Sequence, residues 1–169
     1  MKIEHLHNQQ WYLAQYITGG KNREHLFDWL SNQHMVPWTP LTIKRVKRSD
    51  KLCCYRKRIA AVFPGYFFLK ANFDIHNIAT VRCHSAFCDF VHFGGGISPV
   101  RPRLVEALMK TYPEPELNPA AKEEIIAASD LWLTKEQYNY LLHLEEITQP
   151  ISRISMLYKL VFQAEETCI

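Results

Sequence analysis

Hydrophobic and polar positions alternate most clearly around residues 60–70. Apolar and aromatic side chains lie on both sides of Pro64-Gly65, and after this pair Tyr66 and Phe68 fall on one face of a strand. Because Pro-Gly is a strong turn signal, the segment predicts a buried strand with a turn set into it. A face made of Tyr66 and Phe68 is either core or a docking surface, and the pattern by itself leaves both open.

Other periodic segments predict the remaining elements of residues 1–112. They are a strand at 11–16, a helix at 21–35, a strand at 41–46, a helix at 75–82 capped by Asp74, a strand at 87–93 and a helix at 101–112. The strand at 41–46 enters a basic stretch, and positive charge returns at residues 56–58. This arrangement predicts a hairpin with its tip near Ser49-Asp50.

The C-terminal third of the chain is predicted to be helical. Three prolines within residues 113–119 indicate a stiff linker. Helical patterns follow at 120–128, at 134–146, where Thr134 opens a capping box, and at 151–165. The predicted fold is therefore α+β: an antiparallel four-stranded sheet flanked by helices, with a C-terminal α-helical hairpin. The predicted divisions are a domain at 9–112, the linker at 113–119 and a small helical region at 120–169.

Composition limits the class of protein. A chain of 169 residues with 47% apolar side chains has enough hydrophobic material for one domain with a core. It holds no apolar run long enough for a membrane span and no signal-peptide core near Met1. Five cysteines without a framework spacing predict reduced thiols. We therefore expect a cytoplasmic protein.

Charge is distributed unevenly along the chain. Residues 1–112 carry 16 Lys or Arg against 7 Asp or Glu, whereas residues 113–169 carry 4 against 10. Eight of these cations lie between Lys44 and Arg58, with one acidic residue among them. Such a stretch is either a solvated hairpin or a surface for a polyanion, and the density of charge favours the polyanion.

The usual signatures of catalysis are absent from the sequence. No pair of carboxylates is spaced for acid–base work, no glycine-rich phosphate loop precedes a helix, and no nucleophile motif occurs. Cys83, His84, Cys88 and His92 raise the question of zinc, but they lack the close paired spacing of a structural site. We expect a binding protein with no cofactor and no metal, not an enzyme.

Several motifs, taken in order, resemble a known family. They are Trp11-Tyr12-Leu13, the helix after it, the basic hairpin, Phe63-Pro64-Gly65-Tyr66-Phe67-Phe68 and Phe90-Val91-His92-Phe93-Gly94. Over about residues 9–112 they resemble the N-terminal domain of NusG-type transcription elongation factors. No second β-barrel module follows, so the chain is more similar to the specialised paralogues of the RfaH and plasmid-encoded ActX type.

The resemblance implies a factor that binds RNA polymerase and suppresses pausing and termination. The family's apolar patch, which binds the β′ clamp helices, matches Tyr66, Phe68 and Phe90. The family's contact with the β gate loop matches positions 77–80, of which Thr80 is retained. The resemblance also implies a monomer that contacts nontemplate and upstream DNA and no membrane.

Cationic and amide side chains supply the matching DNA surface. The positions that match the family's DNA-binding surface are Lys21, Arg23, Asn32, Gln33 and Arg82, and the hairpin adds Lys44, Arg45, Lys47 and Arg48. Cations neutralise phosphates and amides read exposed bases, so both groups suit DNA. The alternative is a stand-alone nucleic-acid-binding regulator that does not contact polymerase.

The predicted C-terminal helices allow two interpretations. They form extra core or a small bundle of their own, or they pack an apolar stripe over Tyr66, Phe68 and Phe90 and mask the polymerase site. The acidic excess and the amphipathic pattern favour masking. Refolding of this region into a β-barrel is not expected, because residues 97–169 contain no glycine for the tight turns.

Overall fold

The computed structural model describes residues 9–47, 55–113, 140 and 150–166. The elements, in order, are β1 (Gln10–Tyr16), α1 (Asn22–Asn32), β2 (Val36–Trp38), β3 (Leu41–Lys47), β4 (Tyr55–Ala61), β5 (Tyr66–Ala71), α2 (Ile78–Arg82), β6 (Phe87–Phe90), β7 (His92–Phe93), β8 (Gly96–Ile97), α3 (Pro102–Thr111) and α5 (Pro150–Glu166). The predicted α+β class with an antiparallel four-stranded sheet is confirmed.

The four-stranded sheet has the order β2-β5-β1-β6, and each neighbouring pair is antiparallel. β1 lies in the centre with β5 beside it, in a register that runs from Gln10 opposite Ala71 to Gln15 opposite Tyr66. β6 pairs with the other edge of β1, with an irregularity between Gln15 and Tyr16. Nine of the thirteen residues of β1 and β5 are buried, as expected for strands covered on both faces.

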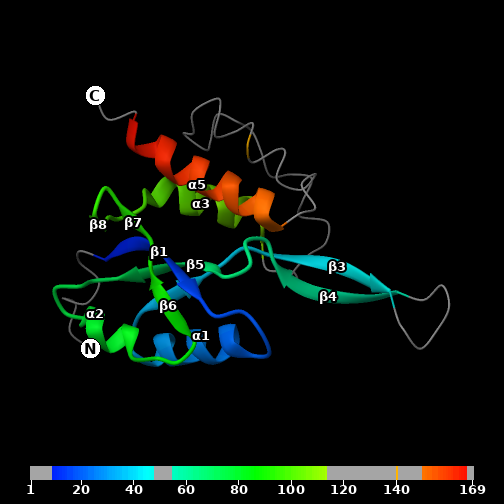
Figure 1. Ribbon diagram of the computed structural model, residues 1–169, viewed down its shortest axis with the longest axis horizontal. Helices are drawn as coiled ribbons and strands as arrows, with labels where there is room; N and C mark the ends of the chain where they lie inside the picture. Colours follow the sequence, from blue (N-terminus) through cyan, green and yellow to red (C-terminus); the bar gives the residue numbers. More distant parts are fainter. Residues whose placement is uncertain (1–8, 48–54, 114–139, 141–149, 167–169) are drawn as a thin grey trace.

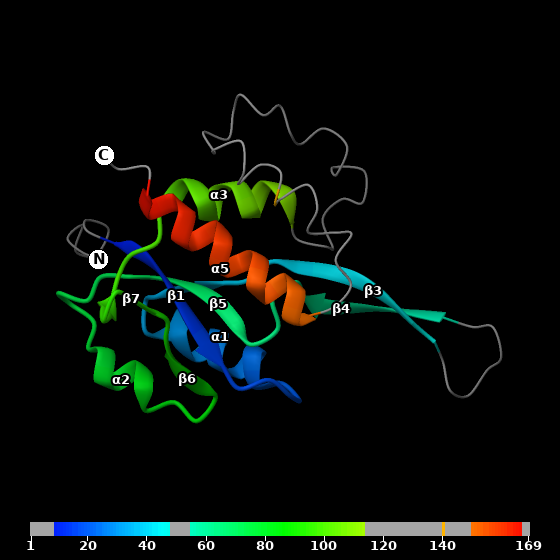
Figure 2. The same cartoon turned by 45° about the horizontal axis from the view of Figure 1, so that its top comes forward.

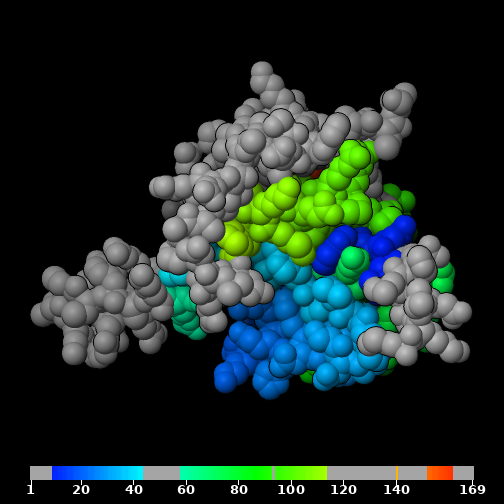
Figure 3. Space-filling model, turned by 180° about the vertical axis from the view of Figure 1, so that it is seen from behind, coloured from blue at the N-terminus to red at the C-terminus, as the bar shows by residue number. Residues whose placement is uncertain are grey.

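Helices cover both faces of this sheet. α3 and α5 lie on one face, and α1 and α2 lie on the other (Figures 1 and 2). From behind, α3 in yellow-green lies above the blue and light-blue N-terminal part (Figure 3). Two hydrophobic cores result, one on each face of the sheet. Alternation along β5 assigns its residues to them: Phe68 belongs to the α3–α5 core, whereas Phe67 and Leu69 belong to the α1–α2 core.

β3 and β4 form a separate two-stranded hairpin that projects away from the sheet (Figure 1). It leaves the body after Pro40 and returns at Val62, whose N–H donates to the Pro40 carbonyl at 2.9 Å. A short turn then leads directly into β5, and Gly65 occupies it with φ 86°, a conformation that favours glycine. The predicted hairpin is confirmed in its two arms, and its predicted tip lies outside the described residues.

Several predicted boundaries are wrong. The segment 60–70 is the end of β4, a turn and β5, so it forms two strands in different sheets. The strand predicted at 41–46 belongs to the hairpin, and the sheet takes β2 in its place, which the pattern missed because it has three residues and a central proline. The strand predicted at 87–93 is divided into β6 and β7.

The helices differ from prediction mainly at their ends. α2 begins three residues later than predicted, because the Asn77 side chain, not that of Asp74, accepts the N–H of Ala79 at 2.9 Å. α5 matches the predicted helix at 151–165 within one residue at each end. The helices predicted at 120–128 and 134–146 lie outside the described residues, apart from Tyr140, and so does most of the predicted linker. No helix in the described segments is long and apolar enough to cross a membrane.

Candidate functional site

Tyr66 opens β5 on the sheet face that α5 covers. Its hydroxyl lies 3.1 Å from that of Tyr158 on α5, and the two rings meet edge to face with centroids 5.7 Å apart. Gln15 on β1 donates its side-chain amide to the same hydroxyl at 3.1 Å. Tyr66 is therefore held from two sides, by its own sheet and by the C-terminal helix.

The environment of Tyr66 perturbs its ionisation. Burial, with a smaller contribution from the hydrogen bond to Tyr158, raises the pKa of the Tyr66 phenol to about 12. The hydroxyl is consequently neutral at any physiological pH. In that form it accepts from Gln15 and shares a hydrogen bond with Tyr158 in which either hydroxyl can donate.

Phe68 lies deeper on the same face. It is 1% exposed and stacks on Trp38 of β2, with ring centroids 6.1 Å apart and planes at 30°. Leu157 and Leu160 of α5 belong to the same buried cluster. Tyr66 and Phe68 therefore share one apolar surface that α5 covers, as the core interpretation predicts, and the docking interpretation stays a prediction.

Phe90 is not part of that surface. It pairs with Ala14 in the register of β6 and β1, is 3% exposed and belongs to the α1–α2 core. Its ring packs against Phe73 with centroids 5.4 Å apart. The prediction that three rings form one patch, covered by the C-terminal helices, is wrong for Phe90, because alternation directs it through the sheet to the opposite face.

The hairpin brings like charges together. Its register places Lys44 opposite Arg58 and Arg45 opposite Lys57, with Val46 opposite Arg56. Directly opposite residues of an antiparallel pair share a face at close range, and like charges there are destabilising. Lys47 ends β3 and Arg48 lies beyond the described residues. The register of the hairpin therefore pairs basic positions with basic positions across its two strands.

The four residues predicted along α1 do not form one cluster. Lys21 and Arg23 lie at its N-terminal end, and Asn32 and Gln33 lie at its C-terminal end. A helix rises about 1.5 Å per residue, so roughly 15 Å separate the two ends. Arg23 forms an ion pair with Glu24 at 3.4 Å. Of the four residues, Arg23 lies at the base of the hairpin, since Arg23 and Arg58 line the same cleft.

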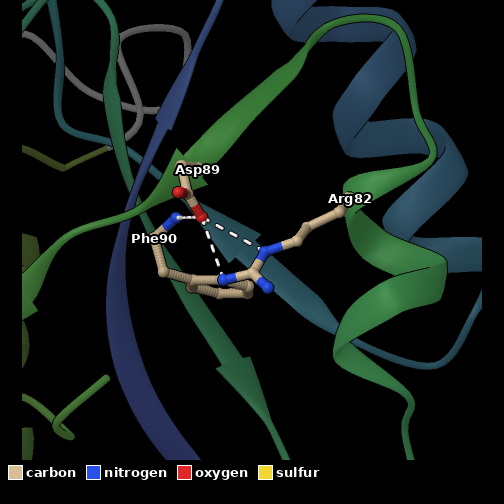
Figure 4. Close-up of polar contacts among 3 residues, drawn as sticks. All are labelled: Arg82, Asp89 and Phe90. Carbon is tan, nitrogen blue, oxygen red and sulfur yellow. Dashed lines mark hydrogen bonds and ion pairs between the residues drawn. The ribbon is translucent and has the colours of Figure 1, made fainter. Parts of the chain in front are cut away.

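Arg82 and Thr80 are both on α2, on the α1 side of the sheet. The Arg82 side chain reaches Asp89 on β6, with two of its nitrogens 3.2 Å from one carboxylate oxygen (Figure 4). The same oxygen accepts the backbone N–H of Phe90 at 2.8 Å (Figure 4). Thr80 is exposed. Arg82 is thus already paired, and Thr80 lies on a different face from Tyr66.

The residues considered for zinc do not converge. Cys83 and Cys88 are exposed free thiols, and His84 accepts the N–H of Ala86 through Nδ1 at 3.1 Å. Within the described ranges, no three His, Cys, Asp or Glu side chains are grouped so that they could hold a metal ion.

Some residues around the site were not predicted. Gln15 and Trp38 lie beside the Tyr66–Phe68 surface, and Arg58 lines the same cleft as Arg23. Gln15 carried a signal, since it is a polar residue between two buried ones near the C-terminal end of β1. Tyr158 lies on the apolar stripe of the predicted helix at 151–165, but its pairing with Tyr66 was not predicted.

Comparison with known proteins adds no identification. No family model matches the chain, and no curated protein matches it either.

Proposed function

We propose that this protein is a transcription elongation and antitermination factor that acts by binding, without chemistry of its own. It holds the β′ clamp helices of RNA polymerase through the surface around Tyr66 and Phe68. Its hairpin and the N-terminal end of α1 hold upstream and nontemplate DNA. Bridging protein and DNA in this way disfavours the paused state, because the factor binds the elongating conformation better.

The observation that carries the proposal is the charge register of the hairpin. Two cross-strand pairs of like charge, Lys44 with Arg58 and Arg45 with Lys57, lie on an arm that projects from the body. A fold selected only for stability would alternate the signs. Phosphates on DNA neutralise such pairs and release counterions, which makes the binding favourable and strongly dependent on salt.

The position of the arm supports a second contact on polymerase. β4 ends at Ala61 and β5 begins at Tyr66, so one short turn joins the basic arm to the aromatic surface. A protein that holds DNA with the arm presents the Tyr66–Phe68 surface at a fixed distance from it. The motif resemblance, which covers these same residues, supports a polymerase helix as its occupant.

α5 regulates that contact in this proposal. Leu157, Leu160 and Val161 are buried on the sheet side, and three such side chains contribute about 5–9 kcal/mol of transfer free energy. Polymerase binding through Tyr66 and Phe68 requires α5 to leave, so the closed form binds polymerase weakly. A ligand shifts this equilibrium only by its preference for the open form.

A second candidate function is favoured by the same closure. The hairpin projects from the body while α5 stays in place (Figure 1), so a stand-alone regulator that binds nucleic acid and never contacts polymerase needs no opening. The two candidates differ in what Tyr66 does. In the second, it is only part of the core.

A binding assay with purified RNA polymerase separates them. Tyr66→Ala is compared with Phe27→Ala, which removes a partly buried ring from the opposite face. We expect Tyr66→Ala to reduce polymerase binding at least tenfold and to retain DNA binding, while Phe27→Ala retains both. Equal effects of the two variants on polymerase binding, or no polymerase binding by the wild type, would count against the polymerase contact and favour the second candidate.

A transcription assay tests the activity itself. The wild type is expected to shorten pauses and increase readthrough of a terminator, and Arg45→Gln together with Lys47→Gln to lower both effects. A protein that binds polymerase but leaves pausing and readthrough unchanged would refute the antitermination role.

A further inference from the structure

A cleft of about 500 Å³ lies at the base of the hairpin. The loop between β1 and α1 and the first turn of α1 form one wall, with Gly19, Gly20 and Arg23. Four consecutive residues of β4, including Arg58 and Ile59, form the other. Its volume lies within the range of about 300–1,000 Å³ that is typical of small-ligand sites. It is separate from the Tyr66–Phe68 surface, whose residues do not line it.

The second wall is an open strand edge. Consecutive strand residues point to opposite faces, so a cleft lined by four in a row follows the edge of β4 rather than one face. β4 pairs only with β3 in its two-stranded sheet, which leaves this edge without a partner strand among the described residues. Polar backbone groups are therefore available along the cleft together with the Arg58 side chain.

The cleft has a cationic part. Arg23 and Arg58 reach it from opposite walls, and their guanidinium groups suit the paired oxygens of a phosphate. Arg58 makes no ion pair with any described residue. Among the described residues Arg23 pairs with Glu24 at 3.4 Å, and Glu24 also lines the cleft. The lining therefore holds two arginines and one acid, and a phosphate between the arginines would offset the remaining positive charge.

The start of α1 lacks a capping side chain and carries mixed charge. Lys21 occupies the N-cap, where it provides no side-chain hydrogen bond, and both Arg23 and the acidic Glu24 lie in the first turn. Cations at a helix N-terminus are unfavourable because the peptide dipoles place partial positive charge there. The side chains that normally cap this end accept hydrogen bonds, and lysine has no acceptor. A phosphate would supply the hydrogen-bond acceptor that Lys21 lacks.

The cleft also has an apolar part. Ile59 is 42% exposed, and its cross-strand partner Ile43 is 46% exposed, which is unusual for a pair of large aliphatic side chains. Ile59 lies next to Arg58 in the lining, so an apolar surface adjoins the cationic one. Gly19 and Gly20 have no atom near their missing Cβ positions, so that side of the cleft stays open.

We infer that this cleft binds one nucleotide, with its phosphate between Arg23 and Arg58 and its base against Ile59. The inference rests on the nucleic-acid half of the proposed function and adds a defined subsite to it. A duplex does not enter a cleft of this volume, whereas an unpaired nucleotide does. The ligand is either a nucleotide of a single strand or a free nucleotide, since both carry the same phosphate and base.

The test is a fluorescence anisotropy titration of the full chain with a short single-stranded DNA, and with the same sequence as a duplex. Arg23→Gln and Arg58→Gln are compared with Lys110→Gln, an exposed cation on α3. We expect each cleft variant to weaken single-strand binding about threefold to tenfold and to lower its salt slope by roughly one unit, with Lys110→Gln unchanged. We expect the double variant to lose less affinity than the product of the two single-variant losses, because both arginines hold the same phosphate.

Two further measurements identify the ligand and the base contact. Ile59→Ser is expected to weaken binding of the single strand while leaving the duplex unaffected. Displacement of the labelled strand by nucleoside monophosphates supports a free nucleotide as ligand, and binding that only oligonucleotides displace supports a strand. Thermal unfolding of each variant verifies that it folds. Arg23→Lys serves as a further control, because it keeps the positive charge while removing the paired N–H donors of the guanidinium.

Wild-type affinity in both cleft variants, while Arg45→Gln weakens binding, would overturn the cleft site and leave DNA binding by the hairpin intact. No binding of either probe by the wild type would overturn the site and the nucleic-acid half of the proposed function together.

Discussion

The contact between α5 and the sheet is tested most directly at Leu157. This side chain is fully buried among residues of the sheet and α3, so Leu157→Ala leaves a cavity that its neighbours fill only partly. Substitutions of this kind cost about 3–5 kcal/mol. For a chain of this size each kcal/mol lowers the Tm by about 2–4 °C, so we expect a fall of about 6–20 °C.

The assay is thermal unfolding followed by circular dichroism, with Ser155→Ala as the matched control. Ser155 lies on the same helix and is exposed, so its substitution should change stability by less than about 0.5 kcal/mol. Hydrogen exchange then shows which part of the structure has lost stability. If α5 opens as a unit of its own, its amides exchange faster in Leu157→Ala while those of β1 keep their protection.

A Tm for Leu157→Ala within about 1 °C of the wild type would refute the reasoning, because a docked helix cannot lose a buried leucine without cost. The argument that α5 closes the Tyr66–Phe68 surface would then fail as well.

Three further predictions follow from the same geometry. The pKa of Tyr66 is raised to about 12 in the folded state and is near 10 in the unfolded state. The stability that this shift contributes is therefore complete below pH 10 and is lost as pH rises through 12. Tyr158→Phe should lower the pKa of Tyr66, which an ultraviolet titration of tyrosinate would measure. Phe90→Leu should cost stability in thermal unfolding but leave polymerase affinity unchanged, and a selective loss of polymerase binding would contradict its place in the opposite core. Asp89→Asn should weaken the ion pair with Arg82 and raise DNA affinity about twofold in titrations at low salt, with a change of stability below about 1 kcal/mol, whereas an unchanged affinity would show that Arg82 does not contact DNA.

The sequence predicted most of the fold because its strongest patterns are local. β1, α1, α3 and α5 have clear periodicity, and the hairpin arms have complementary lengths and a polar connection. β2 was missed because three residues around a proline carry no period. The turn before Tyr66 was predicted. The passage of the chain from the hairpin into the four-stranded sheet at this turn was not, because turn residues do not reveal which sheet the next strand joins.

The candidate site was predictable only in part, for a geometric reason. Tyr66 and Phe68 are two residues apart on one strand, so their shared face followed from alternation. Phe90 is on another strand, and the face it takes depends on the register with β1 and on the irregularity near Gln15, which no pattern within β6 encodes. Arg58 was set aside among eight similar cations, and only the fold distinguishes it by bringing it opposite Arg23.

The hairpin also sets a length scale. Each arm has seven residues, and at about 3.3 Å per residue it extends roughly 23 Å from the point where the chain leaves the body. Along B-DNA, with about 3.4 Å per base pair, that reach corresponds to roughly seven base pairs. If the hairpin lies along DNA as proposed, its arms span about two-thirds of a helical turn, which predicts how far a nuclease footprint extends beyond the body.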